Sequence, residues 1–268
     1  MKPELRNRLL VAIIGIPLAV ACIYFSRWLF LIMISAISAA ALIELQGMKG
    51  CKGFLYRLLG GIFAVALPVS ASLWGSGVVL PALFLLLLLL GVVTIFTPKI
   101  SEAYLGFTVT LLASGLIVLP LTSIVIVHQV MGPITVIYLF GGVWFADSAA
   151  YFFGKHFGKH KLAPQKSPNK SIEGAMASAI GGLTWGFSAG QFFRNRYSWG
   201  DLLVFGLIIG FISMVGDLVQ SILKRESGVK DSGILFPGHG GAYDRFDSLI
   251  FVSAAFYLYF LLRGWITP

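Results

Sequence analysis

Charged side chains are scarce in this sequence. Asp, Glu, Lys and Arg together make up only 12% of the 268 residues, whereas a soluble domain carries roughly 25%. Hydrophobic residues make up 57% of the chain, and the mean hydropathy is +0.89. This composition excludes an ordinary soluble globular domain. It indicates instead that lipid surrounds most of the chain.

Cysteines are also scarce, and two widespread catalytic motifs are absent. The two cysteines, Cys22 and Cys51, lack metal-ligand spacing, and two cysteines do not make a disulfide framework. We therefore expect two free thiols. The sequence contains no G-x-x-x-x-G-K-[ST] phosphate loop and no H-E-x-x-H zinc motif. These absences argue against a phosphate-loop NTPase and against a zinc protease of that type.

Long apolar runs, in contrast, are frequent. A helix of about 20 apolar residues crosses a bilayer, and each such helix satisfies its own backbone groups there. We therefore predict an all-α fold, a polytopic integral membrane bundle of about nine transmembrane helices. The first run follows a basic N-terminus, and we interpret it as a retained span rather than a cleaved signal peptide. The predicted spans are residues 9–25, 28–43, 58–74, 77–96, 107–127, 130–153, 174–193, 201–223 and 246–262.

Positive residues are distributed unequally between alternate loops. Sixteen of the 20 Lys and Arg residues fall in the N-terminal segment and the loops on the same predicted side. Because cytoplasmic loops carry an excess of Lys and Arg, we predict a cytoplasmic N-terminus. The same rule accounts for the net charge of +9, so no nucleic-acid partner is expected. We predict a multi-pass protein of the cell membrane (inner or plasma membrane).

Two long polar loops distinguish the second half of the chain from the first. These loops, at about 154–173 and 224–245, are both predicted to lie on the cytoplasmic side. Residues 1–129 hold spans one to five, and the only signal in this region is its apolar character. Residues 130–268 hold spans six to nine and both polar loops. We predict that this second region is catalytic and that its active site faces the cytoplasm.

Carboxylates inside the predicted spans are the first candidates for function. Charged groups within a bilayer are costly, so Asp147 and Asp217 indicate a functional site. Asp244 and Asp247 lie three residues apart at the start of span nine and share one face of a helix there. At about 1.5 Å per residue, Asp147 and Asp217 both lie roughly 25 Å along their helices. The four carboxylates are therefore predicted to converge near the cytoplasmic boundary.

A divalent cation would offset the repulsion between these carboxylates. Oxygen ligands with partial access to solvent suit Mg²⁺, which takes one or two carboxylates together with substrate phosphates. Ion pairing with Arg245 or Lys224 is the alternative. Glu44, at the end of span two, is interpreted as an interfacial residue. The predicted metal ligands are Asp217, Asp244 and Asp247, with Asp147 as a further candidate.

A glycine-rich turn precedes span nine. Residues 237–241 read Pro-Gly-His-Gly-Gly, and glycine lets backbone N–H groups approach an anion closely. The turn runs into a helix N-terminus, which is a ready anion site, and Arg245 offers a guanidinium fork for phosphate. A flexible turn before a capped helix is the alternative. We expect His239 to donate to phosphate or to serve as a turn residue. The candidate phosphate-binding residues are Gly238, His239, Gly240 and Gly241.

A second polar loop precedes span seven. Ser171 is a predicted N-cap, with Glu173 in the first helical turn. Lys166 and Lys170, four residues apart at the same helix start, also fit a clamp for a triphosphate. The two interpretations remain open on this evidence. The candidate clamp residues are Lys166, Ser167, Asn169 and Lys170. Three lysines interpreted as lipid-surface charges are Lys155, Lys159 and Lys161.

Residues 221–247 resemble a known signature. This run includes a Lys-Arg pair, the Pro-Gly-His-Gly-Gly turn and an Asp-Arg-Phe-Asp run. It is similar to the signature of the phosphatidate cytidylyltransferases, or CDP-diacylglycerol synthases. Residues 167–174 resemble the second motif of that family, and residues 147–158 are also similar. The resemblance covers about the C-terminal half. Ala242 and Tyr243 replace the bulky aliphatic residues that are usual in the family, and we expect changed packing only.

The resemblance implies that CTP and phosphatidate give CDP-diacylglycerol and pyrophosphate, a step of phospholipid biosynthesis. It implies Mg²⁺, with or without a second cation, as the cofactor. CTP, phosphatidate and membrane lipid are then the partners, and a homodimer is left open. The implied catalytic residues are Asp217, Asp244, Asp247, Lys224 and Arg245. The implied substrate-binding residues are Lys166, Ser167, Asn169, Lys170, Arg225, Gly238, His239, Gly240 and Gly241.

Two other functions compete with this interpretation. A CTP-dependent lipid or polyprenol kinase would transfer the γ-phosphoryl group and release CDP, but the full 27-residue run argues against it. An ion-coupled transporter would use the acids within the spans as ion sites. Transporters of that kind carry internal repeats and midplane acids, whereas we find no repeat and place the acids near one face.

Overall fold

Helices account for nearly all of the structure. The computed structural model describes residues 3–193, 196–235 and 240–267. The predicted all-α fold is confirmed, with one small hairpin as the addition. The helices of the first half are α1 (Pro3–Phe25), α2 (Arg27–Met48), α3 (Phe54–Trp74), α4 (Val79–Phe96), α5 (Ile100–Ala113) and α6 (Leu119–Met131). Those of the second half are α7 (Pro133–Phe157), α8 (Ile172–Phe193), α9 (Trp199–Leu207), α10 (Ser213–Glu226) and α11 (Ala242–Leu262).

Irregular turns join some of these helices into longer segments. A 3₁₀ turn, η1 (Ser76–Val78), precedes α4, and π-helical turns η2 (Ser114–Val118) and η3 (Ile208–Ile212) connect α5 to α6 and α9 to α10. Among the residues that the structure describes, seven helical segments are long and apolar enough to cross a bilayer, and α1 contributes a shorter apolar stretch, Ile13–Phe25. A polytopic helical membrane protein is therefore confirmed. The count of nine spans and the cytoplasmic N-terminus stay predictions.

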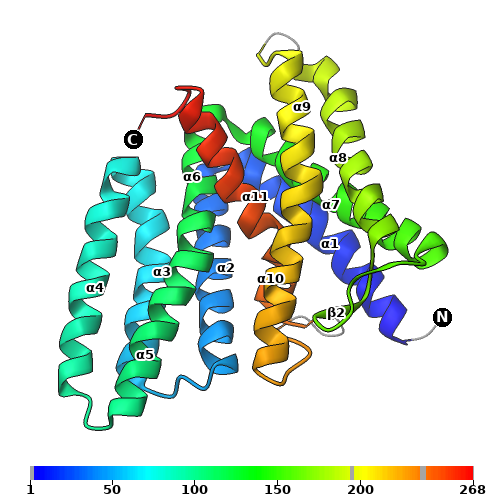
Figure 1. Cartoon of the computed structure of the whole chain (residues 1–268). Helices are drawn as coiled ribbons and strands as arrows, with labels where there is room; N and C mark the ends of the chain where they lie inside the picture. Colours follow the sequence, from blue (N-terminus) through cyan, green and yellow to red (C-terminus); the bar gives the residue numbers. More distant parts are fainter. Residues whose placement is uncertain (1–2, 194–195, 236–239, 268) are drawn as a thin grey trace.

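Helix α11 lies in the middle of the bundle. It contacts α2, α6, α7 and α10, with α3, α4 and α5 on one side and α8 on the other (Figure 1). Fully buried Phe256 and Phe260 of α11 pack against Phe205 of α9. Outward residues of α4 such as Leu88 remain exposed, as expected where lipid rather than protein covers an apolar face. The central helix thus contacts both halves of the chain.

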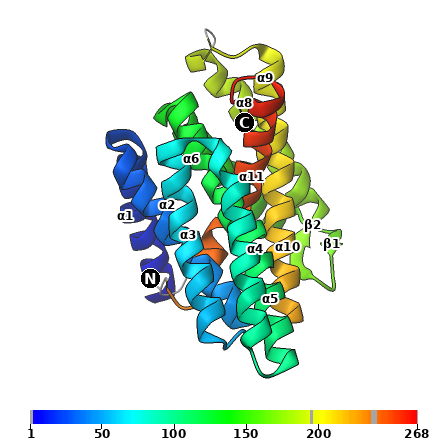
Figure 2. The same cartoon turned by 90° about the vertical axis from the view of Figure 1, so that its left-hand side faces the viewer.

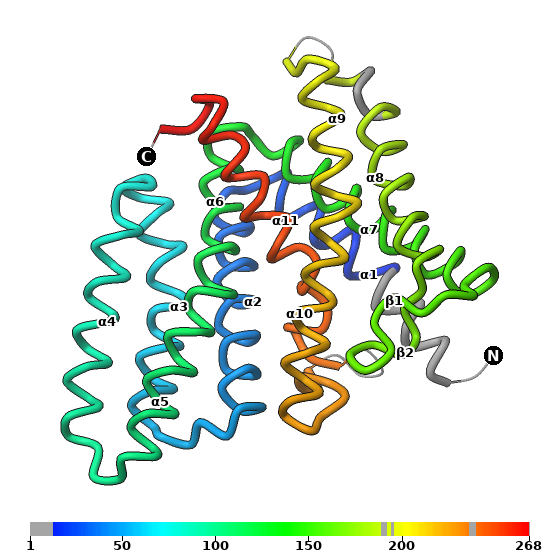
Figure 3. Tube along the Cα trace, viewed as in Figure 1, coloured from blue at the N-terminus to red at the C-terminus, as the bar shows by residue number. Residues whose placement is uncertain are grey.

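A two-stranded hairpin joins α7 to α8, where the sequence predicted only a loop. Strands β1 (Lys161–Ala163) and β2 (Ser167–Ser171) are antiparallel, with Lys161 opposite Ser171. The hairpin lies beside the lower part of α10 in the views of Figures 2 and 3. The hydroxyl of Ser171 accepts the N–H of Gly174 at 3.1 Å, so the predicted N-cap of α8 is confirmed.

Glu173 fixes the hairpin to the end of α7. Its carboxylate accepts the N–H groups of Lys159 and His160 at 3.1 and 3.2 Å and lies 2.7 Å from Nδ1 of His160. Its own backbone N–H and then the His160 side chain hold the pKa of Glu173 at about 2. The carboxylate is therefore an anion at neutral pH.

Glycines allow α8 to approach the η3 turn closely. A Cβ atom at Gly182 would collide with the backbone at Gly206 and Gly210, and a Cβ at Gly210 would collide with α8. The Ser178 hydroxyl donates to the carbonyl of Gly210 at 3.0 Å. Gly182 therefore lies at a close contact between α8 and the η3 turn. This contact sets the position from which α10 continues.

Candidate active site

A large cavity lies where the hairpin, α7, α8, α10 and α11 meet. Its volume is about 1090 Å³, slightly above the roughly 300–1,000 Å³ that is typical of ligand pockets. Polar residues of the hairpin and of α10 and α11 line one part of it. Residues of α1 and the apolar residues of α7 line another part. The cavity therefore presents both a polar and an apolar wall.

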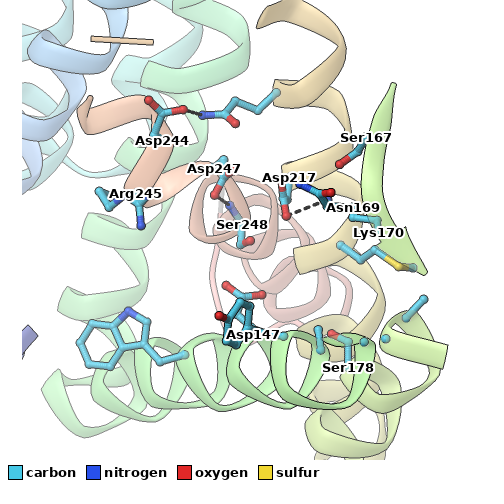
Figure 4. A pocket seen from close by; sticks show the side chains of 18 of the residues that line it. Asp147, Ser167, Asn169, Lys170, Ser178, Asp217, Asp244, Arg245, Asp247 and Ser248 are labelled. Carbon is cyan, nitrogen blue, oxygen red and sulfur yellow. Dashed lines mark hydrogen bonds and ion pairs between the residues drawn. The ribbon is translucent and has the colours of Figure 1, made fainter. Parts of the chain in front are cut away.

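Carboxylates from three helices converge in this cavity. Asp147 comes from α7, Asp217 from α10 and Asp247 from α11 (Figure 4). They lie close enough to repel one another electrostatically. The side chain of Ser248 lies next to Asp147, and its backbone N–H donates to Asp247 at 2.7 Å. The predicted convergence is confirmed for these three acids, which face a common space.

Lys170 lies opposite these acids on the hairpin. Its Nζ atom is 2.7 Å from an Asp217 carboxylate oxygen, and its side chain is 19% exposed. Ser167 and Asn169 of the same strand also line the cavity (Figure 4). Strand β2 therefore places three of the four predicted clamp residues on the wall. The fourth, Lys166, is exposed and is not part of the cavity lining.

Asp244 also lines the cavity but has a different environment. One carboxylate oxygen accepts hydrogen bonds from Nε2 of Gln220 at 2.9 Å and from Nζ of Lys224 at 2.6 Å. The other accepts the N–H and hydroxyl of Ser232 at 2.7 and 2.9 Å and the N–H of Gly241 at 2.9 Å. Both oxygens are thus engaged by protein donors. For Asp244, the structure thus shows the alternative to metal binding, an ion pair with Lys224.

The start of α11 is occupied by a carboxylate of the protein itself. Glu44 of α2 accepts the N–H groups of Ala242 and Tyr243 at 2.8 and 2.9 Å. Two N–H groups of this helix start therefore bind a protein carboxylate, and the phosphate role of the glycine-rich turn stays a prediction. Glu44, which the sequence placed at the interface, has a structural contact that the sequence did not predict. A Cβ atom at Gly241 would collide with the Glu44 carboxylate, which explains the glycine there.

The remaining predicted residues divide between the wall and the surface. Lys224 and Arg245 line the cavity, and Arg245 is exposed with no ion pair to any described residue. Arg225 is exposed, donates to the carbonyl of Val229 at 3.4 Å and is not part of the lining. Gly240 has a positive φ of 82° next to Asp244 and does not reach the wall either.

Some residues on or near the wall were not predicted, and others lie outside the described residues. Lys155 and Lys161, which the sequence indicated as lipid-surface charges, are exposed and also line the cavity. Gln220, Ser232 and Ser248 contact the predicted acids, but no sequence spacing distinguishes them from other polar residues. The predicted phosphate-binding residues Gly238 and His239 lie outside the described residues.

The donor set fits a hard cation that shares its ligands with a substrate. Among the described residues, no group of three or more His, Cys, Asp or Glu is close enough together to hold a metal ion by itself. Mg²⁺ does not require such a group, because it typically uses one or two carboxylates and completes its shell with water and phosphate. Asp217 and Asp247 offer carboxylate oxygens to the cavity. Both carboxylate oxygens of Asp244, in contrast, already accept hydrogen bonds from protein donors.

Fold and site together define a polytopic helical membrane protein with a cavity lined by clustered carboxylates and cationic side chains. Comparison with known families gives the more specific result. Residues 6–263 match the model of the cytidylyltransferase family. The chain belongs to this family.

Curated relatives carry the name phosphatidate cytidylyltransferase. The protein from Bacillus subtilis is 33% identical over 268 residues, which cover 97% of this chain and 98% of the relative. Those from Brucella melitensis and Haemophilus influenzae are 43% and 48% identical over 125 and 134 residues. These matches cover 47% and 48% of this chain, and they span about half the length, 46%, of each relative.

Proposed function

We propose that this protein transfers the cytidylyl group of CTP to phosphatidate, giving CDP-diacylglycerol and pyrophosphate for phospholipid biosynthesis. One observation carries the proposal. The cavity combines clustered carboxylates, the cations Lys170, Lys224 and Arg245, and an apolar wall. A nucleotide and a lipid phosphate require this combination. The family and the names of the relatives support the same reaction.

The apolar wall suits the acyl chains of the lipid. It is formed by Gly15, Ile16 and Ala19 of α1 together with Phe140 and Trp144 of α7. Of these residues, Gly15 and Ile16 are exposed on α1. A lipid can therefore keep its chains among apolar residues while its phosphate reaches the carboxylates and lysines. This arrangement avoids the cost of moving acyl chains into water.

The reaction is a displacement at the α-phosphorus of CTP. An oxygen of the phosphatidate phosphate forms a bond to the α-phosphorus, and the bond from that phosphorus to the oxygen bridging the β-phosphate breaks. Pyrophosphate leaves with that oxygen. A phosphate monoester is already ionised near neutral pH, so no general base is needed. The protein must hold two anionic groups in line and offset their charge.

Cations on the wall perform the binding and orientation. Lys170 on β2 and Lys224 on α10 approach the cavity from different elements, and Arg245 adds a guanidinium from α11. Charge-assisted hydrogen bonds from such groups fix phosphate oxygens in place. Asp244 holds Lys224 at 2.6 Å, so this lysine is oriented before a substrate arrives. We assign the triphosphate to the Lys170 side and the lipid phosphate to the side nearer α1.

Asp217 and Asp247 are the residues that would hold Mg²⁺, with Asp147 next to them. The ion would offset negative charge on the phosphates of both substrates. Of the acids predicted as ligands, Asp244 is assigned the separate task of orienting Lys224. The ion pair between Lys170 and Asp217 must loosen when a cation and a triphosphate bind there. A second cation is not required by this set of side chains.

The polar end of the bundle is assigned to the cytoplasm. The uneven distribution of Lys and Arg between alternate loops supports this orientation, as does the need for a soluble nucleotide to reach the cavity. The relatives are bacterial, so the membrane is the plasma or inner membrane. Outward apolar faces such as that of α4 contact lipid, and a second copy in a homodimer would pack on a face of this kind.

Product analysis tests the proposed reaction. The purified protein in detergent is supplied with CTP, phosphatidate and Mg²⁺, with and without EDTA. We expect CDP-diacylglycerol and pyrophosphate in equal amounts, and neither product with EDTA. Release of CDP with a phosphorylated lipid would establish the kinase instead. Folded protein that turns over no nucleotide would contradict both enzymatic alternatives and leave the transporter to be tested.

A further inference from the structure

Glu44 connects the first half of the chain to the segment that carries the site. It lies on α2, yet its carboxylate contacts the start of α11 and the hydroxyl of Ser232 at 2.8 Å. Glu44 is not part of the cavity lining. It therefore touches the residues that build the site without reaching a substrate.

The contact with α11 satisfies donors that the helix cannot satisfy itself. The first N–H groups of any helix lack partners within it, and the positive end of the helix dipole favours an anion there. Gly241, just before the helix, has no side chain to supply one. Glu44, 198 positions away from Ala242 in sequence, provides the carboxylate instead. The start of the catalytic helix is thus capped by a distant helix.

Ser232 extends this contact to the cavity wall. Its Oγ atom lies 2.8 Å from a Glu44 oxygen and 2.9 Å from an Asp244 oxygen. The other Asp244 oxygen holds Nζ of Lys224, which lines the cavity. The Ser232 hydroxyl has one proton to donate to these two carboxylates, but the Ser232 backbone N–H also donates to Asp244 at 2.7 Å. A continuous path of contacts therefore runs from α2 through Ser232 and Asp244 to Lys224. Displacing Glu44 would alter the position of each later member of this path.

The backbone around Glu44 is shaped to receive its carboxylate. A Cβ atom at either Gly233 or Gly241 would collide with it. Near the end of α2, Lys49 also donates to the carbonyl of Leu223 at 3.2 Å and pairs with Glu226. Helix α2 therefore binds both the end of α10 and the start of α11.

We propose that Glu44 is a positioning residue for the reaction. It holds the start of α11 and Ser232 so that Asp244 keeps Lys224 on the cavity wall. The kinetic part of this inference rests on the proposed function, whereas the restraint on α11 does not. The first half of the chain then supplies more than hydrophobic spans, because one of its carboxylates completes the catalytic segment.

Two substitutions of Glu44 and one control test the inference. Glu44→Ala removes every acceptor, and Glu44→Gln keeps one oxygen and the side-chain volume. Glu102→Gln is the control, because Glu102 is exposed, pairs with Lys99 at 2.9 Å and lies outside the cavity lining. For each folded variant, hydrogen exchange is measured at the amides of Ala242 and Tyr243. The kcat and KM for CTP are measured in parallel.

We expect exchange at Ala242 and Tyr243 to be roughly tenfold or more faster in Glu44→Ala, because hydrogen bonds to a charged acceptor are lost. The kcat/KM for CTP should fall roughly 10- to 100-fold. Glu44→Gln should recover part of both properties, and Glu102→Gln should match the wild type. Ser232→Ala should lower kcat/KM less in the Glu44→Ala background than it does in the wild type, because both residues act on one path.

Different results would overturn different parts of the inference. Unchanged exchange in Glu44→Ala would overturn the restraint on α11. Faster exchange with kcat/KM within about twofold of the wild type would overturn the positioning role. If Glu44→Ala does not fold, Glu44→Gln alone decides, and wild-type exchange and kinetics in it would overturn the proposal. Wild-type protein without cytidylyl transfer would overturn the proposed function only, because the exchange rates would still test the restraint.

Discussion

Lys170 and Asp217 form an ion pair of 2.7 Å that joins strand β2 to helix α10 across the cavity. The pair brings together two residues that sequence analysis assigned to different tasks, a phosphate clamp and a metal site. A triphosphate with its cation presents the charges that both residues need, a negative group for the lysine and a positive one for the carboxylate. The pair therefore marks the position where the nucleotide phosphates are expected.

Lys170→Gln should impair the enzyme strongly, and Lys166→Gln should not. The first lysine faces the cavity and the second, on the same hairpin, is exposed and lies off the wall. Loss of a charge-assisted contact to phosphate should lower kcat/KM for CTP roughly 100-fold in Lys170→Gln. Lys166→Gln should stay within about threefold of the wild type. Steady-state kinetics at fixed phosphatidate measure both, and equal losses would contradict the assignment.

Asp247→Asn and Asp244→Asn should differ in stability although both reduce activity. Within the described part of the chain, Asp247 accepts one hydrogen bond, from the Ser248 N–H. Its substitution should therefore leave the melting temperature nearly unchanged while it abolishes Mg²⁺-supported turnover. Asp244→Asn weakens the ion pair between Lys224 and Asp244, and breaking a buried pair costs roughly 3–5 kcal/mol. Thermal unfolding in detergent measures the difference. A stable, fully active Asp247→Asn would refute the metal role of Asp247.

Ala19→Trp should interfere with the lipid and not with the nucleotide. Ala19 lines the apolar wall of the cavity, whereas Ile13 on the same helix is exposed and lies outside the lining. The bulky side chain should raise the KM for phosphatidate several-fold and leave the KM for CTP unchanged. Ile13→Trp is the matched control and should behave as the wild type. If Ala19→Trp changed the KM for CTP and not the KM for phosphatidate, the lipid would not bind along this wall.

Glu173→Gln should loosen the hairpin and lower kcat/KM for CTP about 3- to 10-fold. Donors from its own backbone and from His160 hold the pKa of Glu173 at about 2, against an ordinary value of 4.5. Because the folded pKa is lowered, the anchor is complete above pH 4.5 and is lost only as the pH falls through about 2. The pH profiles of wild type and variant should therefore run parallel near neutrality. Profiles that converge between about pH 5 and 7 would contradict this.

The sequence predicted the helices and three of the site acids well, for clear physical reasons. Apolar runs must be helical in lipid, and Asp147, Asp217 and Asp247 stand out because charge in such runs is costly. The resemblance around residues 221–247 also pointed to the correct family. These inferences depend on local composition, which a single sequence displays directly.

Long-range pairing accounts for what the sequence did not reveal. The donors at the start of α11 predicted a phosphate site, but two of them donate to Glu44, about 200 residues away. Asp244 was a predicted metal ligand on spacing alone, and only the fold shows that Ser232 and Lys224 fill its oxygens. Lys155 reaches the cavity because of the way α7 is placed. Spacing along the chain carries no information on such contacts.

The fate of labelled CTP tests the proposed reaction most directly. The purified protein is supplied with phosphatidate, Mg²⁺ and CTP labelled at the α-phosphate in one sample and at the γ-phosphate in another. Attack at the α-phosphorus predicts that the α-label enters the lipid fraction and that the γ-label appears in pyrophosphate. If the γ-label enters the lipid while the α-label stays in CDP, the protein is a lipid kinase and the proposed cytidylyl transfer is wrong.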